Sequence, residues 1–113
     1  MQSFVLEAIM SFMLMFTIMG VATDDRAEGE MAGIAIGGMI ALGAAFGGPI
    51  SGASMNPARS FAPALVSGSF SHHWLYWIAP IMGTVLGARA YGLVQGAGAR
   101  DHESSKEARL SRF

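Results

Sequence analysis

Three long apolar segments dominate the pattern of hydrophobic and polar positions along this chain. They cover residues 4–22, 31–50 and 74–94. Each has the roughly 20 residues that a helix needs to cross a bilayer. The first segment is interrupted by Glu7, the second carries no charge, and the third has Arg89 near its end. The pattern therefore predicts an all-α membrane protein with three transmembrane helices.

A fourth, shorter helix is predicted at about residues 56–66, between the second and third long segments. Asn56 is a good N-cap, and Pro57 suits the first helical position, where its missing N–H is no loss. The polar residues 67–69 end this helix after about ten residues, too few to span a bilayer. We predict a re-entrant half-helix that points its positive dipole end at whatever lies in front of it. That arrangement is typical of a pore that passes neutral solutes and repels cations.

Polar groups at the start of the short helix supply the candidate pore chemistry. Asn56 offers an amide that can donate to a passing oxygen, and Arg59 offers five fixed donors that do not deprotonate. The preceding Gly52, Ala53 and Ser54 cannot be helical just before an Asn-Pro pair, and exposed carbonyls at membrane depth are tolerated only beside a wet cavity. The donors of Asn56 and Arg59, opposite the loop carbonyls, form a strip of polar groups whose hydrogen bonds can replace the water molecules around a solute. Arg59 can also clamp the loop carbonyls.

Glu7 is the other side chain that an apolar segment should not contain. It could serve as a proton relay, but we favour a structural role in which it accepts hydrogen bonds from loop N–H groups and holds the short helix in place. His72 and His73 are adjacent and cannot share a helical face as metal ligands. Beside Trp74 they indicate the interface belt at one edge of the membrane.

Composition excludes several classes of function. Charged residues make up 13% of the chain, the formal net charge is −1, and no basic face lies outside the tail, which argues against nucleic-acid binding. Cysteine is absent, so disulfide and thiolate chemistry are excluded. The apolar segments hold no carboxylate chain, nucleophile–base pair or metal cluster. We therefore predict no enzyme activity, no metal and no cofactor.

The basic residues predict the orientation of the chain. The first connection contains Arg26, and the polar tail covers residues 97–113. The basic residues of the tail are Arg100, Lys106, Arg109 and Arg112. With three crossings the connection and the tail lie on one side, which the basic residues assign to the cytoplasm. The short helix then enters from the outer face.

Three pairs of glycines stand four residues apart, a spacing that lets membrane helices approach closely. The pairs are Gly33 and Gly37, Gly43 and Gly47, and Gly83 and Gly87. We expect close helix crossings around the short helix and, as a result, a narrow channel.

Residues 51–60, Ser-Gly-Ala-Ser-Met-Asn-Pro-Ala-Arg-Ser, resemble the second Asn-Pro-Ala loop of the aquaporin, or major intrinsic protein, family. The resemblance covers residues 2–95 and includes Glu7 and the Trp-Ile-Ala-Pro of residues 77–80. Members of this family have two inverted repeats of three spans and a half-helix, conduct water or small uncharged solutes, and usually form tetramers of complete pores. The resemblance implies that residues 1–96 form one such repeat, the second.

The resemblance also implies roles for single residues. It implies a central constriction formed by Asn56, Pro57 and Ala58. It implies an outer selectivity filter formed by Arg59, Ala53 and Ala44.

Two opposing resemblances, to different branches of the family, bear on which solutes the channel passes. Residues 20–27 and 48–55 resemble the nodulin-like intrinsic proteins and their bacterial relatives, which pass glycerol and small metalloid acids. Ala44 stands where strict water channels typically have histidine, which implies a wider opening. Ser60 and Ala64 instead resemble the choices of water channels. We expect water and at least one small polyol or metalloid to pass.

Only one of the family's two repeats is matched, and one half-helix cannot close a pore. We expect a fragment or split half of a channel, or a chain that pairs with a separate first-half subunit, ahead of two copies inserted in opposite orientations. The rival is a non-conducting subunit that packs with or regulates a full-length channel; Asn56 and Arg59 favour descent from a conductor. Either way we expect a multi-pass protein of the plasma or inner membrane, with its C-terminus in the cytoplasm.

Overall fold

The computed structural model describes residues 1–24, 27 and 29–111, and within these residues every regular element is a helix. The elements are α1 (Gln2–Ile18), the π-helical turn η1 (Met19–Thr23), the 3₁₀ turn η2 (Gly29–Met31), α2 (Ala32–Ser51), α3 (Pro57–Ser67) and α4 (Leu75–Leu110). In this described part of the chain, three stretches are long and apolar enough to cross a membrane: Gln2–Thr23, Gly29–Ser51 and Leu75–Leu110. The all-helical class with three apolar helices is confirmed.

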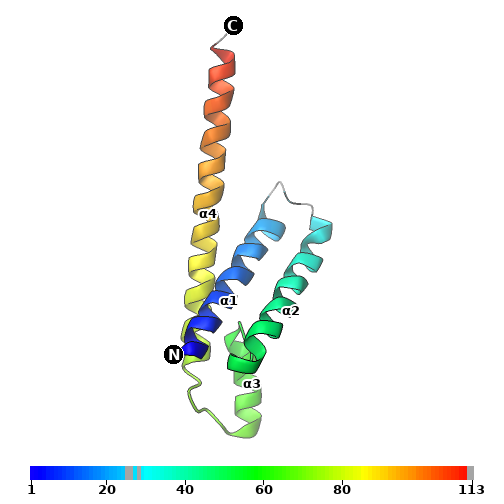
Figure 1. Cartoon of the computed structure of the whole chain (residues 1–113), viewed down its shortest axis with the longest axis vertical. Coiled ribbons are helices and arrows are strands. Elements are labelled where there is room, and N and C mark those ends of the chain that lie inside the picture. Colours follow the sequence, from blue (N-terminus) through cyan, green and yellow to red (C-terminus); the bar gives the residue numbers. More distant parts are fainter. Residues whose placement is uncertain (25–26, 28, 112–113) are drawn as a thin grey trace.

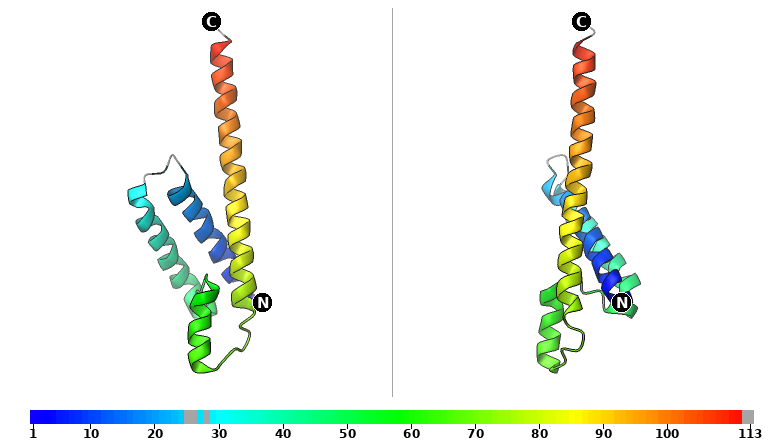
Figure 2. Two further views of the ribbon diagram at one scale, coloured as in Figure 1. Left: turned by 180° about the vertical axis from the view of Figure 1, so that it is seen from behind. Right: turned by 90° about the vertical axis from the view of Figure 1, so that its left-hand side faces the viewer.

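Helix α1 lies between the other two long helices. It packs most extensively against α4 and next against α2 (Figure 1). The short α3 contacts α4 and lies at the end of the molecule where α2 ends and α4 begins (Figure 2). This arrangement places the start of α3, which carries the candidate pore residues, near the end of α2 and the beginning of α4.

The crossing of α1 and α4 depends on two glycines. A Cβ atom built on Gly83 would lie 2.2 Å from the carbonyl oxygen of Ala8, and one on Gly87 would lie 2.5 Å from that of Phe12. Any side chain would therefore overlap the backbone of α1. The close crossing predicted from this glycine pair is confirmed.

The contact between α1 and α2 is filled by flexible methionines. A Cβ on Gly47 would lie 2.3 Å from the sulfur of Met10, and one on Gly43 would lie 3.1 Å from the sulfur of Met55. Met10, Met55 and Ala53 form a buried hydrophobic cluster. Gly43 and Gly47 therefore contact the side chains of Met55 and Met10, and not the backbone of another helix.

The third glycine pair makes no crossing in this structure. Apart from the backbone of α2 itself, no described residue has an atom within 4 Å of a Cβ built on Gly33 or on Gly37, and both residues are exposed. The expected close contact at this pair is wrong for the chain as described, because no neighbouring helix covers that face of α2.

Helix α4 continues well beyond the third apolar segment. Its 36 residues, at 1.5 Å of rise per residue, make a helix of roughly 54 Å, and its C-terminal half extends past the ends of α1 and α2 (Figure 1). The described part of the predicted polar tail is helical and exposed up to Leu110. Arg26 and Arg112, two of the residues that predicted the orientation, lie outside the described residues, so the orientation stays a prediction.

Candidate functional site

The site begins at the N-terminus of α3. Asn56 has an extended backbone (φ −157°), and its side-chain oxygen accepts the N–H of Ala58 at 2.9 Å. Pro57 occupies the first helical position, and Gly68 ends the helix in a left-handed conformation (φ 69°). The cap and the short length predicted from the sequence are both present. Asn56 and Ala58 are exposed.

The loop that joins α2 to α3 has an unusual backbone. Gly52, Ala53 and Met55 have φ values of 83°, 47° and 52°. Glycine enters this left-handed region readily, but alanine and methionine do so only where the surrounding structure holds them. The loop therefore needs strong anchors.

Glu7 is the main anchor of the loop. Its side chain is fully buried, with 0% exposure. One carboxylate oxygen accepts the N–H of Ser54 at 2.9 Å and the hydroxyl of Ser51 at 2.7 Å, and the other accepts the N–H of Met55 at 2.7 Å. The hydrogen bonds to loop N–H groups that the sequence predicted for Glu7 are therefore present.

Arg59 lies one helical turn after Asn56 and reaches back to the loop. Its Nη1 donates to the carbonyl oxygen of Ala53 at 3.0 Å, and the residue is exposed. The Ala53 residue itself is 1% exposed and belongs to the methionine cluster. The structure thus brings Asn56, Arg59 and the Ala53 carbonyl together, and it leaves Ala44 exposed on α2.

Beside Arg59 lies a hydroxyl-rich cavity of about 530 Å³, which the sequence analysis did not predict. Its lining includes Arg59, Tyr76, His73 and Gly52, together with Ser51, Ser54, Ser60, Ser67, Ser69 and Ser71. Ser60 and Ser67 are seven residues apart on α3, so they lie on one face of that helix. This spacing, together with the serines of the following loop, is the sequence pattern that could have indicated the cavity. Ser54 donates to the carbonyl of Asn56 at 2.7 Å and also contacts the hydroxyl of Ser60.

His73 sits at the rim of this cavity among aromatic rings. Its ring centroid lies between 5.6 and 6.4 Å from those of Phe61, Phe70, Tyr76 and Trp77. His72, by contrast, is exposed and lies 3.2 Å from the hydroxyl of Ser71. The two histidines are therefore in different environments, and the described residues contain no group of three or more potential metal ligands.

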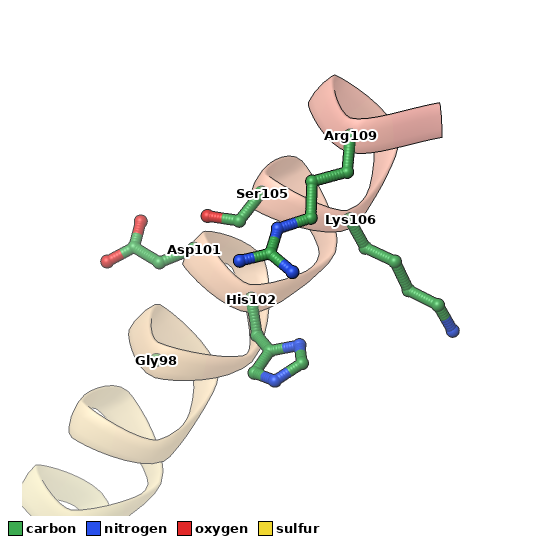
Figure 3. Close-up of a pocket in the computed structure, with 6 residues that line it drawn as sticks. All are labelled: Gly98, Asp101, His102, Ser105, Lys106 and Arg109. Carbon is green, nitrogen blue, oxygen red and sulfur yellow. The ribbon is translucent and has the colours of Figure 1, made fainter. Parts of the chain in front are cut away.

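A second hollow, of about 570 Å³, lies on the C-terminal half of α4 (Figure 3). All its lining residues come from this one helix and are exposed: Gly98, Asp101, His102, Ser105, Lys106 and Arg109. Their side chains project from successive turns of this helix (Figure 3). We therefore place the candidate site at the loop and α3.

Comparison with protein families decides the class of this molecule. Residues 1–91 match the sequence model of the family described as Major intrinsic protein. The chain belongs to this family. Membership and the three apolar helices together indicate an integral membrane protein.

Several members of the major intrinsic protein family are similar to this chain in sequence. Nodulin-26 of Glycine max is 51% identical over 107 residues, which are 95% of this chain and 40% of the relative. Aquaporin NIP1-1 of Zea mays is 56% identical over 83% of this chain and 33% of its own length, and aquaporin NIP3-1 of Arabidopsis thaliana is 57% identical over 82% and 29%. The resemblance to nodulin-like members is confirmed, and the chain spans two fifths or less of the length of these relatives.

Proposed function

We propose that this chain is one half of a passive membrane channel for water and small uncharged solutes. The observation that carries the proposal is the pairing of an exposed Asn56 and an exposed Arg59 at the start of α3, beside a loop anchored by the buried Glu7. The buried carboxylate of Glu7 accepts three hydrogen bonds and so holds the loop that precedes Asn56 and Arg59. Two exposed polar residues held in this way suit a surface that contacts passing solutes. Relatives named aquaporins are channels and not enzymes.

In this proposal α3 is a re-entrant half-helix. Its 11 residues make a helix of roughly 16 Å, about half of the 30 Å hydrocarbon core. The three long helices span the bilayer within residues 1–96, the re-entrant loop enters from the outer face, and residues 97–113 extend into the cytoplasm from the plasma or inner membrane. Irregular backbone then has a reason to lie at membrane depth, because Gly52 and Ser54 of the loop line the cavity beside Arg59.

Asn56, Pro57 and Ala58 form the central constriction of the proposed pore. Arg59, Ala53 and Ala44 form its outer filter. The carbonyls of Gly52, Ala53 and Ser54 contribute acceptors, and the fixed positive charge of Arg59 with the N-terminal dipole of α3 repels cations and protons. The small side chain at Ala44 admits glycerol or a metalloid acid as well as water.

The missing half of the pore is supplied by another chain. Asn56, Ala58 and Arg59 are exposed, and so is the glycine face of α2 at Gly33 and Gly37. A partner that carries the other repeat covers these surfaces and provides the opposing half-helix. Complete pores of this kind then associate as tetramers.

Osmotic flux through proteoliposomes tests the proposal. The chain is reconstituted alone and together with a chain that carries the other repeat of nodulin-26, and shrinkage is followed by stopped-flow light scattering in an impermeant solute and then in glycerol. The double variant Asn56→Asp, Arg59→Ala serves as the matched control. Faster shrinkage than in empty liposomes, lost in the double variant, is expected for the paired chains.

Two other results carry meaning. Fast shrinkage with this chain alone would show that it assembles a pore from its own copies. Shrinkage no faster than in empty liposomes in both preparations, with both proteins folded and inserted, would contradict the proposal. That result would favour a non-conducting subunit or a remnant of a full-length channel.

A further inference from the structure

The carbonyl group at the end of α2 has a partner from another helix. A helix leaves its last four carbonyl groups without donors of its own. The carbonyl of Gly48 receives the N–H of Gly52 at 3.0 Å. The carbonyl of Ser51 receives the phenol hydroxyl of Tyr76, from the first turn of α4, at 2.6 Å. A side chain of α4 thus completes the end of α2.

Ser51 is the residue at which three elements meet. Its hydroxyl oxygen lies 2.7 Å from a carboxylate oxygen of Glu7 on α1 and accepts the N–H of Ala53 at 3.2 Å. Its carbonyl accepts the hydroxyl of Tyr76 on α4. The residue is 5% exposed, so these hydrogen bonds have little competition from solvent.

Gly52 alone separates Ser51 from Ala53, the residue whose carbonyl binds Arg59. Gly52 and Ala53 both have left-handed backbones, and the carbonyl of Ala53 accepts Nη1 of Arg59 at 3.0 Å. Glu7 anchors the loop on both sides of Ala53, through the N–H groups of Ser54 and Met55 and through the hydroxyl of Ser51. Tyr76 adds a separate anchor before Ala53, at the carbonyl of Ser51.

We infer that Tyr76 is a positioning residue for Arg59. Its hydroxyl, through the Ser51 carbonyl, holds the loop in the conformation that presents the Ala53 carbonyl to the Arg59 guanidinium. Tyr76 and Arg59 line the same cavity of about 530 Å³, so without the phenol hydroxyl the Ser51 carbonyl turns to cavity water and the loop relaxes. The inference rests on the proposed function only where it treats Arg59 as a filter residue.

The rate at which Arg59 reacts with phenylglyoxal tests this inference. The full chain in lipid vesicles is treated with the reagent, and the modification of each arginine is measured by mass spectrometry. Tyr76→Phe removes only the hydroxyl, and Tyr91→Phe is the matched control, because the chain has two tyrosines and the hydroxyl of Tyr91 donates to Asp24 instead. We expect Arg59 to react about five times faster in Tyr76→Phe, the effect of one lost hydrogen bond, while Arg89 is unchanged.

An unchanged rate at Arg59 in Tyr76→Phe, or an equal rise in Tyr91→Phe, would overturn the inference. If Tyr76→Phe does not insert, 3-fluorotyrosine is incorporated in the Tyr91→Phe background, where position 76 is the only labelled site. The more acidic phenol is a stronger donor, so Arg59 should then react more slowly, and an unchanged rate would overturn the inference. The measurement involves no flux, so a failure of the chain to conduct leaves this result standing.

Discussion

Two glycine pairs with the same spacing lie in opposite surroundings in this chain. Gly83 and Gly87 on α4 meet the carbonyl oxygens of Ala8 and Phe12, so closely that a Cβ would overlap them. A Cβ built on Gly33 or Gly37 of α2 would have no atom of another described element within 4 Å. A four-residue spacing of glycines therefore permits a close approach between helices, whereas the presence of a partner helix decides whether one occurs.

The same contrast separates the two sides of the molecule. On the packed side, α1 holds α4 through the glycine crossing and holds the loop through Glu7. On the open side, Asn56, Arg59 and Ala44 are exposed together with the outer face of α2. The residues with the most hydrogen bonds and closest contacts therefore hold the chain itself together, and the candidate pore residues are exposed, where we propose that a second chain packs.

Exchanging glycine for alanine at each pair gives the largest expected effect. Gly83→Ala places a methyl group against the Ala8 carbonyl and should lower the free energy of unfolding by about 3 kcal/mol, because α1 and α4 must move apart. Gly37→Ala should instead raise it by roughly 0.5 kcal/mol, because alanine is the better helix former and meets no neighbour. Both are measured by titration with a denaturing detergent and circular dichroism. Equal destabilisation by the two variants would mean that the face of α2 is already covered.

Neutralising Glu7 should have the next largest effect. In Glu7→Gln the amide has one acceptor oxygen, so one of the N–H groups of Ser54 and Met55 faces an NH2 group instead, at a cost of about 2 kcal/mol in unfolding free energy. The exposed Glu30→Gln is the control and should change stability by less than about 0.5 kcal/mol. Hydrogen exchange at the two loop amides provides the local readout. Unchanged protection there would rule out Glu7 as the anchor of the loop.

Removing the cap of α3 should have a moderate effect. Asn56→Ala deletes the acceptor for the N–H of Ala58 and should lower the free energy of unfolding by about 1 kcal/mol. Asn56→Ser keeps an acceptor and should change it by only a few tenths of a kcal/mol, roughly. The two variants are compared in the same detergent titration. If both cost the same, the side chain acts through something other than the cap.

Substitution at Ala44 should have the smallest effect on stability. Ala44 is exposed on α2, so Ala44→His should change the free energy of unfolding by less than about 0.5 kcal/mol. In a conducting preparation the bulkier side chain should reduce glycerol flux more than water flux, as measured by stopped-flow light scattering. Equal loss of both fluxes would mean that this position does not set the aperture.

Much of the local structure follows from residue types alone. Asn56 and Pro57 predicted the start of α3, and the length and composition of the apolar segments predicted the three long helices. The cap is a contact between residues two apart, and hydropathy is a sum over neighbours, so neither depends on the rest of the fold. The hydrogen bonds of Glu7 were predictable in kind, because a carboxylate in an apolar helix must find donors.

Other features of the site could not be predicted in this way. The hydrogen bond from Tyr76 to Ser51 joins residues 25 positions apart. The serine-lined cavity forms only when α3 and the following loop turn back toward α4. Such contacts depend on how whole helices are placed, and no local pattern reports that placement.

The sequence by itself determined the all-helical class, the apolar segments, the cap at Asn56 and the need of Glu7 for hydrogen-bond donors, since these follow from local hydropathy, capping and the rarity of charge in apolar segments. The tertiary structure alone decided which glycine pair becomes a crossing and which donors reach Glu7. It also decided that Tyr76 completes the end of α2. The physical reason is that backbone contact and hydrogen bonding act over a few ångströms, and only the packed chain brings distant residues within that range.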